Sequence, residues 1–256
     1  MARHILRTLC LLTFATALAA VAHADDKKPE NSAVKPRQRK DKAAVTRHEA
    51  FLQRAQKGGV DVLFLGDSIT QGWEGNGKEV WKKNFEPMHA ANFGIGGDRT
   101  EDVLWRITEG KELAGINPKA VVLMIGTNNV GSNTAEQIAE GVAAIVKEIR
   151  RQKPGTKILL LGVFPRGAKG AKGPYKDKFR AAADELQPKI KQINERIARL
   201  DDGQNVRYLD IGGHFLDKDD SLPRAIMPDL LHLSPKGYEI WAEAIKAPLA
   251  EMVNKK

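Results

Sequence analysis

Apolar and polar positions follow two periods along the chain, and together they predict strands that alternate with helices. Short apolar runs bounded by turn residues are typical of buried strands, whereas apolar residues repeated every three or four positions are typical of amphipathic helices. The apolar runs predict five strands, at residues 60–66, 90–94, 119–125, 156–165 and 205–212.

Helical spacing fills the stretches before, between and after these strands. The longest such stretch, residues 134–155, begins at a threonine suited to cap a helix and ends at a Pro-Gly pair. Another helical stretch is expected to begin after Pro174 and to be broken or bent at Pro188. The predicted helices cover residues 44–57, 79–88, 100–113, 134–155, 176–200 and 234–253.

This alternation predicts the fold class. Strands that are apolar on both faces and separated by helices indicate a parallel sheet with helices on both sides. We therefore expect residues 45–256 to form one α/β domain, a three-layer α/β/α sandwich of flavodoxin-like type with a five-stranded parallel sheet. Ligand sites in such sheets lie beyond the carboxyl ends of the strands, so residues that directly follow strands are the first candidates for function.

The residues before this domain have a different character. Residues 1–24 combine basic residues, an apolar stretch and the small-x-small sequence Ala22-His23-Ala24, which is typical of an export signal cleaved near Ala24. A retained membrane anchor is the alternative, but the apolar stretch is shorter than the ~20 residues that a spanning helix needs. Residues 25–44 are rich in charge and poor in large apolar side chains, so we expect a flexible tether.

Composition excludes several classes of function. The chain carries a net charge of +9, of which +4 falls on residues 45–256, and no basic run stands out there. Nucleic-acid binding needs many clustered phosphate contacts, so this charge argues against it. The only cysteine is Cys10, within the predicted signal. Cleavage would leave no disulfide, no thiolate metal site and no cysteine nucleophile.

Side chains suited to acyl transfer follow three strands and recur near the C-terminus. Such chemistry needs a hydroxyl, a base, a group that orients the base, and donors for the oxyanion. Ser68 in "GDS" supplies a hydroxyl, His232 in "DLLH" a base, and Asp229 a carboxylate one turn earlier. Candidate oxyanion donors are the Ser68 N–H, a glycine N–H in "GIGGD" (residues 94–98) and the Asn128 side chain in "GTNN".

Each element alone has an ordinary structural explanation. A serine after a strand often caps a helix, and "GIGGD" lacks the G-x-G-x-x-G spacing of a dinucleotide loop. His214, with Asp210 nearby, competes with His232 for the role of base. Asp67 neighbours Ser68 in sequence, so its side chain should point away from the serine and fix the turn by accepting backbone bonds.

The four elements together resemble the GDSL/SGNH hydrolase superfamily. Ser68, Gly97, Asn128 and His232 occur in the order that names it. Within it, the chain is most similar to the type IB platelet-activating factor acetylhydrolase catalytic subunits. That likeness covers most of the folded chain, in "FLGDSITQGW", "HAANFGIGGDRTEDVLWRI", "VLMIGTNN", "LLLGVFPRG" and "DLLHLSPKGY". Asn129 departs from the aspartate found in many members, at a position without an assigned catalytic role.

The resemblance implies roles for these residues. Ser68 is the nucleophile, His232 the general base and Asp229 its orienter, while the Ser68 N–H, the Gly97 N–H and Asn128 Nδ2 bind the oxyanion. It implies a serine esterase that needs no metal and no cofactor. Because an imidazole base must be neutral to act, activity should rise from acid to mildly alkaline pH. A homodimer is compatible with the resemblance, although no stretch of the sequence specifies an interface.

The residues indicate the substrate less directly than they indicate the reaction. The resemblance suggests a short acyl group such as acetyl, carried by a small molecule or by a polymer. Carbohydrate O-acetylesterase and lysophospholipase-type activities are alternatives, as is an exported binding module that has lost turnover. The Gly- and Lys-rich residues 165–178 fit either a solvent loop or a rim that contacts substrate. A nucleotide-binding flavodoxin-like protein ranks lowest.

Overall fold

The sheet has the five parallel strands that the sequence predicts. The computed structural model describes residues 30–167 and 183–254. The strands are β1 (Val62–Gly66), β2 (Ala90–Gly94), β3 (Ala120–Met124), β4 (Lys157–Leu161) and β5 (Val206–Leu209), in the spatial order β2-β1-β3-β4-β5. Gly66 pairs with Gly94 and with Met124, so the carboxyl ends of β1, β2 and β3 meet at one edge of the sheet.

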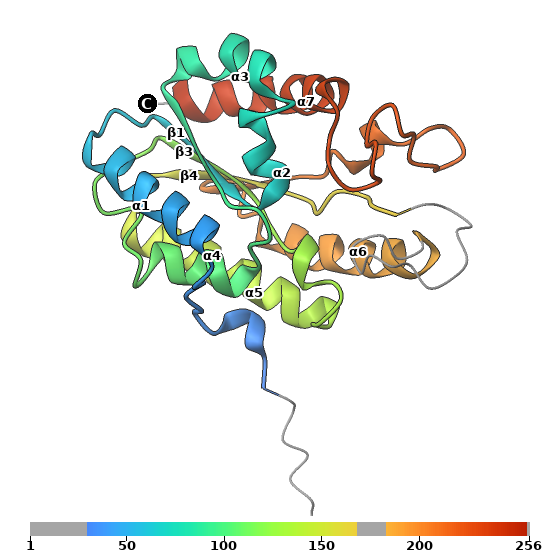
Figure 1. Ribbon diagram of the computed structural model, residues 1–256, viewed down its shortest axis with the longest axis horizontal. Coiled ribbons are helices and arrows are strands. Elements are labelled where there is room, and N and C mark those ends of the chain that lie inside the picture. Colours follow the sequence, from blue (N-terminus) through green and yellow to red (C-terminus); the bar gives the residue numbers. More distant parts are fainter. Residues whose placement is uncertain (1–29, 168–182, 255–256) are drawn as a thin grey trace, which may run out of the picture. The chain divides into compact units, whose positions relative to one another are not determined.

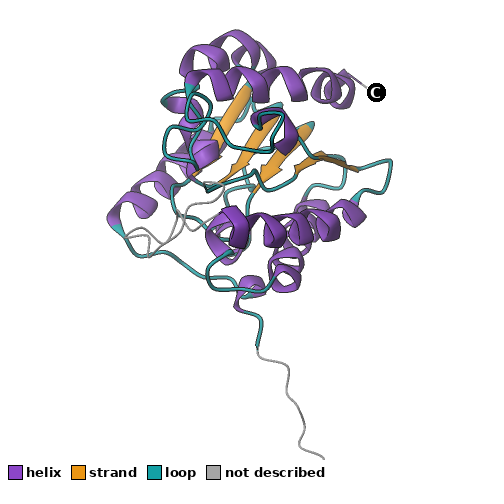
Figure 2. Cartoon of the chain, turned by 90° about the vertical axis from the view of Figure 1, so that its right-hand side faces the viewer, coloured by secondary structure: helices purple, strands orange, loops and turns teal. Residues whose placement is uncertain are grey.

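Helices cover both faces of this sheet. Helices α3 and α7 pack together on one face, and α1, α4, α5 and α6 lie on the other (Figure 1). The view in Figure 2 shows the strands between the two helical layers. The predicted three-layer α/β/α class is therefore confirmed. The helices are α1 (Lys42–Gln56), α2 (Ser68–Gln71), α3 (Lys78–Asn84), α4 (Thr100–Ile107), α5 (Ala135–Gln152), α6 (Ala183–Ile197) and α7 (Pro235–Asn254).

Two apolar clusters, one on each face, follow from the two-residue period of the strands. On β1, Leu63 and Leu65 join the cluster under α1, α4, α5 and α6, whereas Val62 and Phe64 join the cluster under α7. All four side chains are fully buried. This explains why the strands read as continuous apolar runs in the sequence.

Some element boundaries differ from the prediction. Helix α4 ends at Ile107 rather than at residue 113, because Thr108 leaves helical geometry and its hydroxyl donates to the Leu104 carbonyl. Pro188 lies inside α6 and does not end it. Short 3₁₀ helices at Ser32–Val34, Gly72–Glu74, Thr127–Asn129 and Gly212–Phe215 were not predicted, and the predicted helices 79–88 and 176–200 end in the 3₁₀ helices Glu86–Met88 and Ala198–Leu200.

The tether predicted at residues 25–44 is wrong for residues 31–44. The folded unit begins at Asn31, and α1 begins at Lys42. Ala33 is fully buried, and the Arg37 backbone N–H donates to the Glu101 carbonyl. Arg37 and Arg39 pair with the buried carboxylates of Asp102 and Asp98, so composition alone gave the wrong expectation. Residues 25–29 lie outside the described part.

Other predictions also concern residues outside the described part. The signal expected at residues 1–24 lies there, as does most of the loop at residues 165–178. Within residues 30–167 and 183–254, no helix combines the length and the apolar character needed to cross a membrane.

Candidate active site

Ser68 is placed by a tight junction between β1 and α2. Asp67 Oδ1 accepts a hydrogen bond of 2.9 Å from the Ile69 N–H and so caps α2, as expected for a side chain that fixes the turn. A Cβ atom at Gly66 would lie 2.2 Å from Thr70 Oγ1 and 2.4 Å from the Met124 carbonyl oxygen. Only glycine allows this close approach, which sets Ser68 partly exposed just beyond the sheet.

His232 and Asp229 lie in the loop that precedes α7, and local bonds shape this loop. Asp229 Oδ1 accepts from the backbone N–H groups of Leu231 (3.1 Å) and His232 (2.7 Å). Leu230 adopts a positive φ of 64°, and its carbonyl accepts from the Gly167 N–H. The carboxylate thereby turns back toward its own histidine within three residues.

Ser68, His232 and Asp229 form one chain of hydrogen bonds. His232 Nε2 lies 2.9 Å from Ser68 Oγ across 164 residues of sequence, and His232 Nδ1 lies 2.7 Å from Asp229 Oδ2. The predicted proximity of the three side chains is thus present in the structure.

The protonation of this chain follows from Asp229. Burial alone would raise the pKa of Asp229, but the hydrogen bonds from the His232 N–H and imidazole outweigh burial and hold that pKa below its ordinary value. An ionised carboxylate only accepts, so Nδ1 carries a proton, and in the neutral imidazole Nε2 then presents its lone pair to the Ser68 hydroxyl. This is the arrangement in which an imidazole can take a proton from serine.

The two other predicted site residues are connected through loop 94–98, which approaches Ser68 at Gly96. Gly97 is exposed with φ +82°, and an ideal Cβ on its neighbour Gly96 would lie 3.8 Å from the Ser68 Cβ. Asn128 is buried at the end of β3, and its Nδ2 donates to the Asp98 carbonyl at 2.9 Å. That bond uses one of the two N–H groups of the amide. The roles of Gly97 and Asn128 as oxyanion donors stay a prediction.

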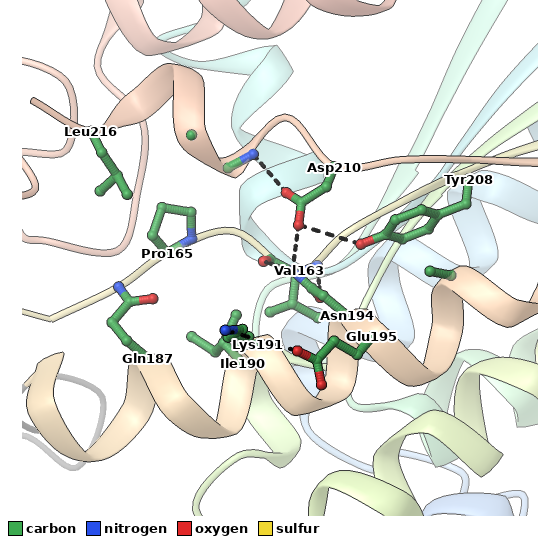
Figure 3. A pocket seen from close by; sticks show the side chains of 13 residues that line it. Val163, Pro165, Gln187, Ile190, Lys191, Asn194, Glu195, Tyr208, Asp210 and Leu216 are labelled. Carbon is green, nitrogen blue, oxygen red and sulfur yellow. Dashed lines mark hydrogen bonds and ion pairs between the residues drawn. The ribbon is translucent and has the colours of Figure 1, made fainter. Parts of the chain in front are cut away.

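The alternative base His214 is not paired with Asp210. Asp210 accepts from Asn194 Nδ2, the Tyr208 hydroxyl and the Gly212 N–H, in a cavity of about 430 Å³ between α6 and the end of β5 (Figure 3). His214 is exposed and lies outside the set of residues that line this cavity. Neither Ser68 nor His232 lines it either.

Among residues 30–167 and 183–254, no group of three or more His, Cys, Asp or Glu side chains could hold a metal ion.

Comparison with known proteins identifies the family. Residues 64–240 match the model of the GDSL-like Lipase/Acylhydrolase family, and this span includes Ser68, Gly97, Asn128, Asp229 and His232. The chain belongs to this family. It is therefore a carboxylic ester hydrolase, and its substrate is an acyl ester.

Relatives in sequence and in structure agree with this membership. The chain is 39% identical over 210 residues to the rat platelet-activating factor acetylhydrolase IB subunit alpha2, covering 82% of each protein. It is 36% identical over 207 residues to the human subunit alpha1, covering 80% of this chain and 82% of that protein. A GDSL-like lipase from Bacteroides thetaiotaomicron shares the fold, with a TM-score of 0.60 and 22% identity over 81% of this chain and 95% of the other.

Sequence reasoning missed the side chains that brace loop 94–98 of this GDSL-family chain. Gln71 Oε1 accepts from the Gly96 N–H at 2.7 Å, and Arg39 Nη1 donates to the Gly96 carbonyl at 2.6 Å. Arg106 and Arg39 bind opposite oxygens of Asp98, both at 2.9 Å. Burial raises the pKa of Asp98 to about 6, against the opposing effect of the two arginines. Gln71 lies one helical turn after Ser68, but no sequence signal connects Arg39 to this loop.

Proposed function

We propose that this GDSL-family enzyme hydrolyses short-chain esters by nucleophilic catalysis at Ser68, with His232 as general base and Asp229 as its orienting carboxylate. The observation that carries the proposal is the pair of hydrogen bonds at 2.9 Å and 2.7 Å that joins the three side chains. A hydroxyl, an imidazole and a carboxylate in this order have the geometry of a serine hydrolase.

The first half-reaction forms an acyl-enzyme. His232 Nε2 takes the Ser68 proton as Oγ attacks the ester carbonyl carbon, and Asp229 stabilises the imidazolium that results. The Ser68 N–H, the Gly97 N–H and the second N–H of Asn128 Nδ2 stabilise the negative charge on the former carbonyl oxygen. The tetrahedral intermediate collapses when the imidazolium gives its proton to the departing alkoxide, which leaves as the alcohol.

The second half-reaction restores the enzyme. Water donates a proton to His232 Nε2 and attacks the acyl carbon, and the second tetrahedral intermediate releases the carboxylic acid as Ser68 Oγ regains a proton. Acetyl is the acyl group that we favour, because the curated relatives are named acetylhydrolases. The natural alcohol is left to experiment, with phospholipid and carbohydrate esters as the two classes to compare.

Matched alanine variants test the roles. Ser68→Ala and His232→Ala should each lower kcat for p-nitrophenyl acetate by a factor on the order of 10⁴ or more. Ser221, whose hydroxyl bonds to Asp219 within its own loop, and the exposed His214 provide the controls. Ser221→Ala and His214→Ala should retain activity. Full activity in Ser68→Ala would refute the proposal, and a loss in His214→Ala would reassign the base.

A panel of esters tests the acyl preference. We expect kcat/KM for p-nitrophenyl esters to fall as the acyl chain lengthens from acetyl to octanoyl. A maximum at octanoyl would contradict the acetyl preference while leaving the serine mechanism intact. Acetylated phospholipid and acetylated sugar, compared at equal concentration, then decide the alcohol.

We further propose that the enzyme acts outside the cytoplasm, as a chain that has lost residues 1–24. The proposal is supported by the basic, apolar and small-x-small pattern of that stretch. The intact mass of the protein recovered after expression in a bacterial host should correspond to a chain starting at Asp25. A full-length chain retained in the cytoplasm would contradict it.

A further inference from the structure

The two peptide units that flank the Gly96 Cα atom are held by groups from two distant parts of the chain. Gln71, from α2, binds the Gly96 N–H, and Arg39, from the segment before α1, binds the Gly96 carbonyl. The Gly97 N–H belongs to the same peptide unit as that carbonyl. It is also the backbone donor proposed above for the oxyanion.

Peptide geometry links the carbonyl to the donor. In a planar trans peptide the C=O and N–H bonds point in opposite directions, and no cis peptide bond occurs among residues 30–167 and 183–254. The Arg39 contact on the Gly96 oxygen therefore fixes the direction in which the Gly97 N–H points. A glycine at φ +82° has few steric limits of its own, so the Arg39 contact adds to the backbone bond from the Asp98 N–H to the Ile95 carbonyl in holding this orientation of the peptide.

The Arg39 guanidinium is itself held in place. Its Nη1 also binds Asp98 Oδ1 at 2.9 Å, and its Nε binds Asp41 Oδ2 at 2.9 Å. Asp98 is fully buried, and its second oxygen is 2.9 Å from Arg106 Nε. The Arg39 side chain is only 23% exposed. These contacts make it a fixed cation rather than a mobile surface side chain.

We propose that Arg39 is a positioning residue of the active site, which orients and polarises the Gly96 to Gly97 peptide so that the Gly97 N–H is ready to bind the oxyanion. A cation on the carbonyl oxygen draws electron density from the peptide and makes its N–H a stronger donor. The inference rests on the proposed function.

Arg37 provides a matched control on the same segment. Its guanidinium makes two bonds to Asp102, at 2.8 Å and 2.9 Å, and so holds the segment to the start of α4. Like Arg39, it pairs with a carboxylate that is almost completely buried. Its bonds go to α4 and not to the Gly96 carbonyl. Loss of either arginine removes an ion pair with a buried carboxylate, but only loss of Arg39 removes the hydrogen bond to the Gly96 carbonyl.

The experiment compares Arg39→Ala, Arg39→Lys and Arg37→Ala in the full chain with p-nitrophenyl acetate. Removal of one oxyanion donor costs about 10²–10³ in kcat, and misorientation of one donor should cost part of that. We expect Arg39→Ala to lower kcat roughly 10- to 100-fold with KM changed less than about threefold. Arg37→Ala should keep kcat within about threefold of the parent. Arg39→Lys should recover part of the lost kcat. A lysine ammonium can bind the Gly96 carbonyl or Asp98, but it cannot reproduce the planar guanidinium that binds both.

A boronic acid inhibitor separates positioning from general damage. Methylboronic acid forms a tetrahedral adduct with a serine hydroxyl and places an oxygen where the oxyanion develops. In Arg39→Ala its inhibition constant should rise by about the same factor by which kcat/KM falls. Equal loss of kcat in Arg37→Ala and Arg39→Ala, or unchanged boronate affinity in Arg39→Ala, would overturn the inference.

The Ser68→Ala variant distinguishes the two proposals. If Ser68→Ala stays active, the proposed function is wrong. If Ser68→Ala is inactive and Arg39→Ala is fully active, only the inference about Arg39 is wrong.

Discussion

At the scale of single residues, neighbouring carboxylates of this enzyme have opposite environments. Asp229 is partly exposed and receives three hydrogen bonds, which lower its pKa despite burial. Asp67 is completely buried and receives one bond on Oδ1, and desolvation raises its pKa to about 7. Their environments therefore suit Asp229 to orient a base as an anion and Asp67 to cap α2.

Asp229→Asn tests the orienting role without removing the shape of the side chain. The amide oxygen can still accept from the Leu231 and His232 N–H groups, so the loop should persist. The amide nitrogen would face His232 Nδ1 as a donor and force the imidazole into the wrong tautomer. We expect kcat to fall by a factor on the order of 10⁴ with a nearly unchanged melting temperature. A variant with more than a tenth of the parent kcat would contradict the assignment.

Asp67→Asn tests the buried carboxyl through the pH dependence of stability. A folded-state pKa of about 7, above the ordinary 3.8, means that the folded protein holds a proton that the unfolded chain releases between these values. The contribution of Asp67 to stability is then complete below about pH 4 and is lost as pH rises toward 7.

The expected readout is the difference between two unfolding curves. The free energy of unfolding of Asp67→Asn should be close to that of the parent at pH 4 and should exceed it increasingly toward pH 7, by up to about 4 kcal/mol. Urea titrations at both pH values measure this difference. A constant difference across the range would show that Asp67 is ionised in the folded protein.

At the scale of elements, the segment before α1 behaves as part of the domain. Ser32–Val34 forms a turn whose Asn31 cap also reaches α5, where Asn31 Nδ2 donates to the Gln137 carbonyl. Thr100, the first residue of α4, donates its hydroxyl to the Ala33 carbonyl. The segment thus links the starts of two helices and holds Arg39 over loop 94–98.

Hydrogen exchange tests this attachment directly. The Arg37 amide, which donates to the Glu101 carbonyl at 3.0 Å, should exchange on the order of 100-fold more slowly than an unstructured peptide of the same sequence. The amide of Val121 in β3 serves as the reference for the protected core. If the Arg37 amide exchanges at the rate of an unstructured peptide, the segment is a flexible tether and its attachment to the domain is contradicted.

At the scale of the whole molecule, the local pattern predicted the strands, the family resemblance predicted the pairing of Ser68 with His232, and the long-range ion pairs of segment 31–44 were missed. Five strands were readable because buried parallel strands are continuous apolar runs, and the residues around Ser68 because they follow strand ends. The segment 31–44 was misread because its charges pair with partners that folding brings near, such as Arg37 with Asp102, 65 residues away. Local composition carries no information about such pairing. The contact between Arg39 and the Gly96 carbonyl was missed for the same reason.

The central claim is that Ser68 carries the acyl group during turnover, and mass spectrometry of the trapped enzyme tests it most directly. A fluorophosphonate should inactivate the enzyme with a stoichiometry of about one, and peptide mapping should find the adduct on Ser68. The His232→Ala variant should react far more slowly, because its serine lacks the base. An adduct on another residue, or an enzyme that stays active with Ser68 fully modified, would contradict the account.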